Sequence, residues 1–273
     1  MLEAAGKVNV VRVAGGRRSA DRDRVATEEP LEIRLQGRPF AVVMRTPGAD
    51  RELTAGFLLA ERVLASADDL GTVAHCTDEG ADHPENVVNV TLTGEAAGAL
   101  ERLLASRRLV AISSSCGMCG RLTIDSLRAS APPLTDAWTV GPETLLAMPK
   151  RLRAAQAVFD ETGGLHAAGL FTREGVLEHA AEDVGRHNAV DKVIGQMVMR
   201  DAIPLSDRML FVSGRSSFEI VQKAFLAGIP IVASVSAPSS LAIALAQEAG
   251  VTLVGFVRGD TLNIYSHPER IGP

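Results

Sequence analysis

The sequence predicts an α/β protein in which a domain with a parallel βαβαβ core follows a smaller α+β domain. Three observations lead to this fold class. Apolar runs alternate with amphipathic helical segments over residues 208–257, the pattern of buried strands joined by helices. Residues 31–36 alternate apolar and polar side chains, which is the period of a half-buried strand. The length of 273 residues fits two domains of about 150 residues each.

The composition and periodicity of the N-terminal half predict an arm followed by a small domain. Residues 1–29 are rich in Arg, Asp and Gly and show no sustained period, so we expect a mostly mobile arm. Two apolar-rich runs on either side of Gly37 predict a hairpin. Residues 51–65 have the period of a helix, and a further strand and short helix complete an α+β domain over residues 30–108.

Residues 109–273 are expected to form the α/β domain. RMLFVSG, IPIVASV and VTLVGFV are interpreted as three buried strands, and Gly228 and Gly250 end the two helices between them. Right-handed crossovers make these strands parallel, and ligands bind at the carboxyl ends of parallel strands. Three loops are therefore candidates for a binding edge: residues 213–217, 234–240 and 258–263.

Composition argues against several classes of protein. The chain has 33 acidic and 28 basic side chains, whereas a general nucleic-acid binder is usually basic. Aromatic residues are only 4% of the chain, too few for platforms that stack on single-stranded nucleic acid. The uncharged stretch between Lys223 and Glu248 contains Pro230 and Pro238, so we interpret it as strand, turn and helix and not as a membrane span. Three cysteines and no visible secretory signal favour the reducing cytoplasm.

The strongest candidate for chemistry is the pair Cys116 and Cys119 in SSSCGMCGR. Two thiols three positions apart can share a metal, form a disulfide, or act as nucleophile and partner. Arg121 and the start of a helix expected here would stabilise a thiolate. Half of a zinc site is the alternative, but the chain has no second pair, so we expect no tightly bound metal. Cys76 is interpreted as an incidental thiol.

Two further motifs contain histidines. TGGLHAAGLF places two glycines, which allow close backbone approach, before His166, although a core histidine with its hydrogen bonds satisfied would also fit. EDVGRHNAVDKVIG brings Arg186, His187 and several charges to one helix start. A solvated helix face, or an N-cap at Asp183, would also account for those charges.

Two glycine-containing loops have residues that can bind an anion. SGRSSFE, with Ser213 and Arg215, can hold phosphate or a carboxylate at a helix start. GFVRGDTLN places Arg258 and Gly259 directly after a strand, where they can meet an anion. Glycine loops of this kind are weak motifs when each is taken alone.

Deaminase chemistry is disfavoured by the order of the motifs. A zinc nucleoside deaminase carries H-x-E before P-C-x-x-C, with the Glu as proton shuttle. Here the cysteine pair precedes His166, Ala168 stands where that Glu would be, and no Pro precedes Cys116. A thioredoxin-like reductase is also disfavoured, because the pair is not set in the usual short βαβ start.

Taken together, these segments resemble the formate dehydrogenase accessory sulfurtransferase family, the FdhD proteins. The resemblance covers most of the chain from about residue 30 onward, in one order. The matching runs are GFLLAER (56–62), SSCGMCGR (114–121), TGGLHAA (162–168), EDVGRHNAVDKVIG (182–195), SGRSSFEIVQKA (213–224), SAPSSLAIALA (236–246) and GFVRGDTLNIYSHPERI (255–271).

The resemblance implies both a fold and a function. The fold would be a cytidine-deaminase-like three-layer α/β domain with a smaller α+β domain. The function would be to take persulfide sulfur from a cysteine desulfurase and pass it to the bis-molybdopterin guanine dinucleotide cofactor of formate dehydrogenase. Cys116 matches the family's persulfide carrier, and family members are homodimers. Cys119 would either release the sulfur by attacking Cys116 or hold a second persulfide.

The resemblance also implies where the cofactor binds. It matches the cofactor segment to Phe256, Val257, Arg258, Gly259, Asp260 and Thr261. The other candidates, from the residues themselves, are Arg186, His187, Ser213 and Arg215. Two alternative functions remain: a molybdenum-cofactor carrier or chaperone without sulfur transfer, and a metal-binding nucleotide enzyme on the same fold.

Overall fold

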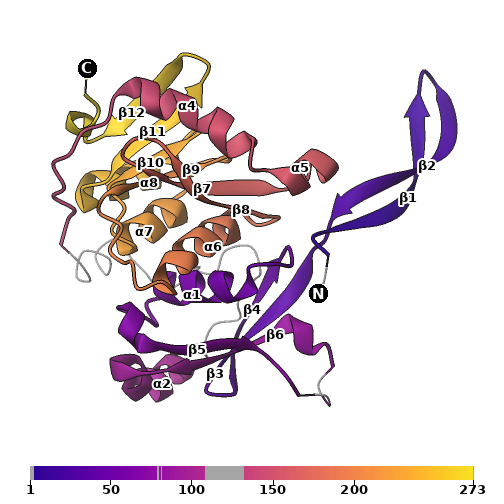
Figure 1. The fold of residues 1–273 in the computed structure, drawn as a ribbon, viewed down its shortest axis with the longest axis horizontal. Coiled ribbons are helices and arrows are strands. Elements are labelled where there is room, and N and C mark those ends of the chain that lie inside the picture. The colour runs from indigo at the N-terminus through magenta and orange to yellow at the C-terminus, as the bar shows by residue number, and fades with distance from the viewer. Residues whose placement is uncertain (1–2, 79, 81, 108–131, 273) are drawn as a thin grey trace.

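The structure is a computed structural model that describes residues 3–78, 80, 82–107 and 132–272. The described chain forms three sheets: a two-stranded ribbon, a four-stranded sheet and a six-stranded sheet (Figure 1). The predicted strand end and helix around Cys116 and Cys119, and the predicted domain boundary at residues 108–109, lie outside the described residues. No helix in the described part of the chain is long and apolar enough to cross a membrane.

The N-terminal residues form a ribbon that projects from the rest of the molecule (Figure 1). Strand β1 (Ala5–Ala14) pairs antiparallel with β2 (Arg17–Ala26) along its whole length. We expected a mostly mobile arm over residues 1–29. The sequence shows no period of two here because both faces of the ribbon are solvated and neither is apolar throughout. The informative signal is the turn, where Gly15 and Gly16 both have positive φ, as a two-residue hairpin loop requires.

The four-stranded sheet has the strand order β4-β3-β6-β5. Its strands are β3 (Glu29–Leu35), β4 (Arg38–Arg45), β5 (Leu70–His75) and β6 (Val87–Leu92). The predicted hairpin around Gly37 is confirmed, and Leu31, Ile33 and Leu35 are fully buried on one face. Helix α1 (Asp50–Ala60) covers one face of the sheet and α2 (Gly94–Arg107) lies on the other (Figure 1).

The six-stranded sheet has the strand order β12-β11-β10-β9-β7-β8. Its strands are β7 (His166–Thr172), β8 (Leu177–Asp183), β9 (Arg208–Val212), β10 (Ile231–Ser234), β11 (Thr252–Arg258) and β12 (Thr261–Ser266). The pairs β9–β10 and β10–β11 are parallel, which confirms the predicted α/β class and the βαβαβ core. Strands β7, β8 and β12 add antiparallel pairs at the two sides. The closer likeness to cytidine deaminases stays a prediction.

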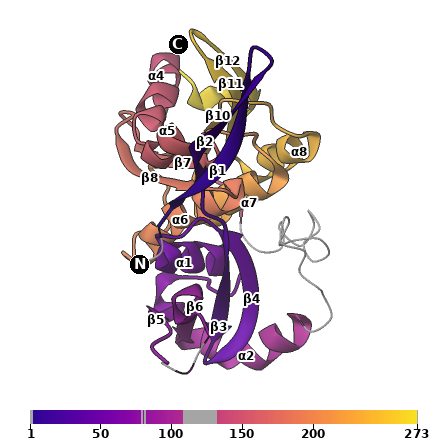
Figure 2. The same cartoon turned by 90° about the vertical axis from the view of Figure 1, so that its right-hand side faces the viewer.

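Helices cover both faces of this sheet, so the unit has three layers (Figure 2). They are α4 (Pro142–Arg153), α5 (Ala157–Thr162), α6 (Arg186–Val198), α7 (Phe218–Leu226) and α8 (Ser240–Ala249). Successive strand residues point to opposite faces. Leu210 therefore joins the core with α6, α7 and α8, whereas Phe211 joins a second core with α4.

The two larger sheets are joined by a close helix crossing. A Cβ added at Gly195 on α6 would lie 1.8 Å from the Glu52 carbonyl oxygen of α1. A Cβ added at Gly56 on α1 would lie 2.0 Å from the Asp191 carbonyl oxygen. The backbones approach so closely that only glycine fits at either position. As a result, one hydrophobic core runs from the four-stranded sheet through α1 and α6 to the six-stranded sheet.

Candidate functional site

Five strand ends meet at one edge of the six-stranded sheet. Strands β9, β10 and β11 are parallel and end there. Strand β7 is antiparallel to β9 and β8 is antiparallel to β7, so β7 begins and β8 ends at the same edge. His166, Asp183 and Ser213 are therefore brought together, with Val235 and Arg258 further along the edge. This is the edge at which ligands gather in parallel α/β sheets.

Ser213 and His166 lie where β7 and β9 meet. The Ser213 backbone N–H donates to the Ala167 carbonyl over 2.9 Å, and the Ser213 hydroxyl accepts from the Ala167 N–H over 2.8 Å. A Cβ at Gly214 would lie 3.4 Å from Nδ1 of His166, an ordinary van der Waals contact, so the loop after β9 lies next to the His166 ring. Because the Ser213 hydroxyl accepts the Ala167 N–H, its own proton stays available to a ligand.

Asp183 organises the start of α6. Its carboxylate accepts from the Gly185 N–H and the Asn188 amide, each over 2.8 Å, and lies 2.7 Å from the Lys192 ammonium. The helix begins at Arg186 with Gly185 as its N-cap, so the alternative of an N-cap at Asp183 is wrong. The alternative of a solvated helix face is also wrong, because Asp183, Asp191 and Lys192 are buried.

The same network ties α6 to the segment between β4 and α1. Lys192 donates to the carbonyl oxygens of Thr46 over 2.9 Å and Glu182 over 3.2 Å. Asn188 donates to the Met44 carbonyl over 2.8 Å. The ammonium thus has three acceptors for its three protons, which compensates for its burial. This arrangement fixes the direction in which Arg186 and His187 leave the helix start.

A second buried ion pair joins α7 to α6. The Lys223 ammonium contacts the two carboxylate oxygens of Asp191 over 2.6 and 2.8 Å. Burial raises the pKa of Asp191 to about 6, and the Lys223 charge opposes that rise. Lys223 also places a positive charge near His187.

His187 faces the start of α7. Its Nε2 lies 3.2 Å from the Ser217 hydroxyl and 3.8 Å from a Glu219 carboxylate oxygen. Burial, and after it the charges of Lys223 and Arg186, together lower the pKa of His187 to about 4. His187 is therefore a neutral imidazole at neutral pH, which can both donate and accept a hydrogen bond.

The pKa of His187 makes the stability of the fold depend on pH. An unfolded His binds a proton below about pH 6.5, whereas the folded state keeps His187 neutral until about pH 4. The stabilisation is complete above pH 6.5 and is lost as the pH falls towards 4. As the pH falls from 6.5 to 4, we expect the free energy of unfolding of wild type to decrease by roughly 1–3 kcal/mol more than that of His187→Gln. Urea unfolding across this range measures the difference, and a difference that does not change with pH would contradict the assignment.

Arg186 supplies the positive charge beside the two histidines. Its Nε is buried and has no hydrogen-bond partner among the described residues, although buried donors are normally paired. The pKa of His166 is lowered by burial and then by the nearby Arg186 charge. A cation with an unpaired donor beside two uncharged imidazoles is suited to a phosphate or another anion.

The C-terminal candidate segment lies at the end of β11. Arg258 Nε donates to the Val235 carbonyl over 2.7 Å, so this side chain ties β11 to the loop after β10. Phe256 and Gly259 both have positive φ, and the Arg258 guanidinium lies 5.7 Å from the Phe256 ring centroid. The Val257 side chain is fully buried in the core, which leaves only its main chain for a ligand.

The remaining candidates of this edge differ in exposure. Asp260 and Thr261 form the exposed turn into β12, where the Thr261 hydroxyl donates to the Arg258 carbonyl over 3.2 Å. Arg215 is exposed. The hydroxyl of Ser216, next to it, is fully buried and has no partner in the described part of the chain. Cys116 and Cys119 lie outside the described residues, and the described part of the chain contains no group of three His, Cys, Asp or Glu side chains that could hold a metal.

Sequence reasoning missed a cavity of about 600 Å³ on the α4 side of this edge. His166, at the start of β7, and Ser213 and Val235, directly after β9 and β10, line it from the sheet edge. The residues that were not expected are Arg153, Gln156 and Phe159, with the Arg153 guanidinium 4.8 Å from the Phe159 ring centroid. The helical segments that carry them gave no motif, so only the fold shows that they line this cavity.

Comparison with known proteins gives consistent results. The model of the FdhD/NarQ family matches residues 26–272. The sulfur carrier protein FdhD of Streptomyces avermitilis is 49% identical over 270 residues, covering 96% of this chain and 94% of that protein. The sulfur carrier protein FdhD of Anaeromyxobacter dehalogenans is 51% identical over 259 residues, covering 93% and 90%.

A solved structure extends the likeness to three dimensions. A crystal structure from Desulfotalea psychrophila, described as a formate dehydrogenase accessory protein, superimposes with a TM-score of 0.77. It is 26% identical and covers 98% of this chain and 100% of its own. The resemblance carried by the sequence motifs is confirmed, and the chain belongs to the FdhD/NarQ family.

Proposed function

We propose that this chain is a sulfurtransferase that carries sulfur, as a cysteine persulfide, to the molybdenum cofactor of a formate dehydrogenase. The observation that carries the proposal is its near full-length similarity, at about half identical residues, to proteins named sulfur carriers. The same observation favours sulfur transfer over a cofactor chaperone without sulfur transfer and over a metal-binding nucleotide enzyme.

The cysteine pair supplies the chemistry of the first step. The Cys116 thiolate attacks the outer sulfur of a persulfide on a cysteine desulfurase. A sulfur–sulfur bond forms at Cys116, the bond in the donor breaks, and the donor cysteine leaves as a thiolate. If Cys119 then attacks the Sγ of Cys116, a Cys116–Cys119 disulfide forms and the outer sulfur leaves as sulfide. Alternatively, Cys119 holds a second persulfide.

The strand-end edge is the proposed binding site for the substrate, the bis-molybdopterin guanine dinucleotide cofactor. Its diphosphate groups need positive charge and N–H donors. The unpaired Nε of Arg186, the exposed Arg215 and the guanidinium of Arg258 supply charge along this edge. The neutral His187 supplies a hydrogen bond without adding further charge. A net acidic protein thus concentrates cations where the anionic cofactor would lie.

Restoration of enzyme activity tests the proposed function. A bacterial strain that lacks its own sulfur carrier should regain formate dehydrogenase activity when it expresses this chain. The matching cysteine desulfurase must be present, because it is the proposed sulfur donor. Failure to restore any activity, with the protein shown to be folded and abundant, would overturn the proposed sulfur transfer.

We further propose that the protein works in the cytoplasm as a homodimer.

Guanine nucleotide is expected to bind this edge. We expect GDP to compete with the cofactor, because both present a guanine and a diphosphate. Arg258→Ala should weaken GDP binding by roughly 1–3 kcal/mol if a charge-assisted phosphate contact is lost. Calorimetry measures this, with Arg102→Ala as a control, because Arg102 is exposed on α2 and away from the edge.

The outcomes of that titration are distinct. An Arg258→Ala variant with unchanged affinity would restrict Arg258 to its hydrogen bond with Val235. Wild type that fails to bind GDP at millimolar concentration would remove the nucleotide from this edge, and would leave the persulfide chemistry of Cys116 untouched.

A further inference from the structure

The four-stranded sheet has an open edge at β5. Among the described strands, β5 has β6 as its one neighbour and pairs with it antiparallel. The register is shifted between Leu70 and Val73 and is regular from Val73 to His75. The strand contains no proline and no lysine, the residues that commonly protect an edge strand from pairing with another chain. Strand β5 is therefore able to accept a further strand.

The outward backbone groups of β5 are the groups that an added strand would bind. The Cys76 N–H donates to the Val87 carbonyl over 2.9 Å, which makes these two residues a hydrogen-bonded pair. Hydrogen-bonded and non-hydrogen-bonded pairs alternate in an antiparallel ladder, so the main-chain groups of Val73 and His75 point away from β6. Groups of this kind bind an extended peptide through main-chain hydrogen bonds.

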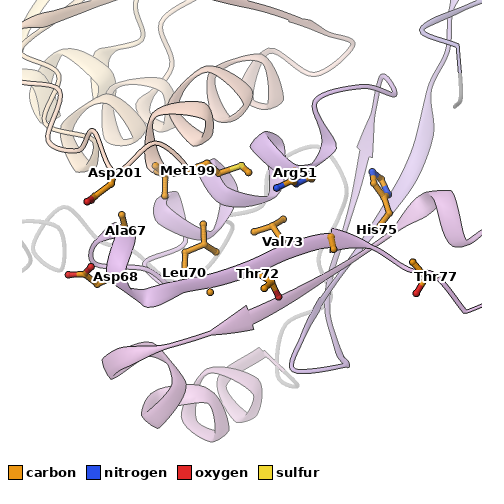
Figure 3. A pocket seen from close by; sticks show the side chains of 13 residues that line it. Arg51, Ala67, Asp68, Leu70, Thr72, Val73, His75, Thr77, Met199 and Asp201 are labelled. Atoms are coloured by element: carbon orange, nitrogen blue, oxygen red, sulfur yellow. The ribbon is translucent and has the colours of Figure 1, made fainter.

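A groove of about 1010 Å³ runs along this edge and is called the β5 groove below (Figure 3). Leu70 and Val73 line it from the strand, whereas Val198 and Met199 line it from the end of α6. Successive residues of an extended peptide point to opposite faces. A peptide with an apolar side chain at every second position could therefore pack one whole row of side chains against these walls.

One end of the β5 groove is acidic. Asp68 and Asp201, both exposed, lie together there, and Arg51 lies further along the groove (Figure 3). Neither carboxylate has an ion-pair partner in the described part of the chain. Asp201 follows the end of α6, where the helix carries partial negative charge and its last turn has no basic side chain. Arg200, just beyond that turn, contacts His179 over 3.1 Å. This end of the groove therefore attracts a cation.

We propose that the β5 groove binds an extended segment of a partner protein, with alternate apolar side chains on the groove walls and a basic end over Asp68 and Asp201. The segment adds to the four-stranded sheet beside β5. It runs antiparallel to β5, because antiparallel pairs are slightly more stable than parallel ones, so its basic residues lie at its C-terminal end. The inference concerns a contact with another protein and does not depend on sulfur transfer.

A synthetic probe tests the proposal with the full chain. The probe is a fluorescein-labelled peptide of Thr-Val repeats followed by a pair of lysines, and fluorescence anisotropy measures its affinity. We expect saturable binding with a dissociation constant below about 1 mM. A second peptide with glutamates in place of the lysines should bind roughly tenfold more weakly, because it places like charges together.

A charge exchange tests whether the two aspartates hold the basic end. Asp68→Lys with Asp201→Lys should weaken binding of the lysine probe roughly tenfold and should strengthen binding of the glutamate probe. The matched control is Glu28→Lys with Asp82→Lys, which changes the net charge equally at two exposed carboxylates outside the groove. The control should keep the affinity for the lysine probe within about twofold of wild type.

N-methylation of the probe tests the backbone pairing. An N-methyl group removes a main-chain donor, and the donors of alternate residues point to opposite sides of an extended strand. One probe is methylated at its valines and another at its threonines. One of the two should lose binding, because its methyl groups face β5, whereas the other should bind like the unmodified probe.

Four results would overturn the proposal. They are wild type that does not bind the lysine probe at millimolar concentration, groove variants that bind it like wild type, and methylated probes that bind equally well. The fourth comes from hydrogen exchange without the probe. If protection of the Val73 and His75 amides increases with protein concentration, a second copy of this chain occupies the groove in place of another protein.

Discussion

Cys116→Ala is expected to reduce the activation of formate dehydrogenase to the level of cells that lack this protein. The alanine side chain has no sulfur on which a persulfide can form, and no other group replaces a missing nucleophile. The fold should be retained, because a small thiol in a glycine-rich segment supports little packing. The measurement is formate dehydrogenase activity in the complemented strain, together with thermal unfolding of the purified variant.

Cys76→Ala is the matched control for this prediction. Cys76 is a free thiol at the end of β5, and we interpret it as incidental. Its replacement should leave activation unchanged. Cys119→Ala should reduce activation by less than Cys116→Ala or by a comparable amount, depending on whether it releases sulfide or holds a second persulfide. Full activation by Cys116→Ala would remove the carrier role from this residue.

Lys192→Met is expected to have the largest effect on stability. The substitution leaves the Asp183 carboxylate buried without its cation, 2.7 Å from where the ammonium lay. Removing one partner of a buried pair costs about 3–5 kcal/mol. It also leaves the Thr46 carbonyl without the donor that ties α6 to the segment before α1. Urea unfolding measures the loss.

Two further variants show whether the buried charge is the cause. Lys150→Met changes an exposed lysine at the end of α4 and should stay within about 0.5 kcal/mol of wild type. Lys192→Met combined with Asp183→Asn removes the uncompensated charge and should recover part of the lost stability. A Lys192→Met protein that is as stable as wild type would show that Asp183 does not need its partner.

The parallel core was predictable because its signals are local. Each of its strands is a short apolar run, and a glycine ends each helix between them. The hairpin around Gly37 was predictable for the same reason, since Leu31, Ile33 and Leu35 alternate with polar residues. The ribbon β1–β2 was not, because a two-stranded ribbon in solvent has no buried face that would impose a pattern.

The sequence nominated candidate residues at strand ends and helix starts, and the structure brings several of them to one edge, but the contacts among them could not be predicted. The motifs identified His187 and Arg186, and the strand ends identified the edge. A solvated helix face was one alternative for the charges around them, whereas Lys192 and Lys223 are buried ion-pair partners of Asp183 and Asp191. Such pairs join residues on different elements, so no spacing along the chain indicates them. The crossing at Gly56 and Gly195 is also a tertiary contact, and glycines within two helices were its one visible sign.

The central claim is that Cys116 carries the sulfur. Mass spectrometry of the protein after incubation with a cysteine desulfurase and cysteine tests it most directly. The account predicts that the peptide containing Cys116 gains the mass of one sulfur atom, that a reductant removes it, and that the Cys76 peptide stays unchanged. A Cys116 peptide that gains no sulfur, while the desulfurase itself is shown to carry a persulfide, would contradict the account.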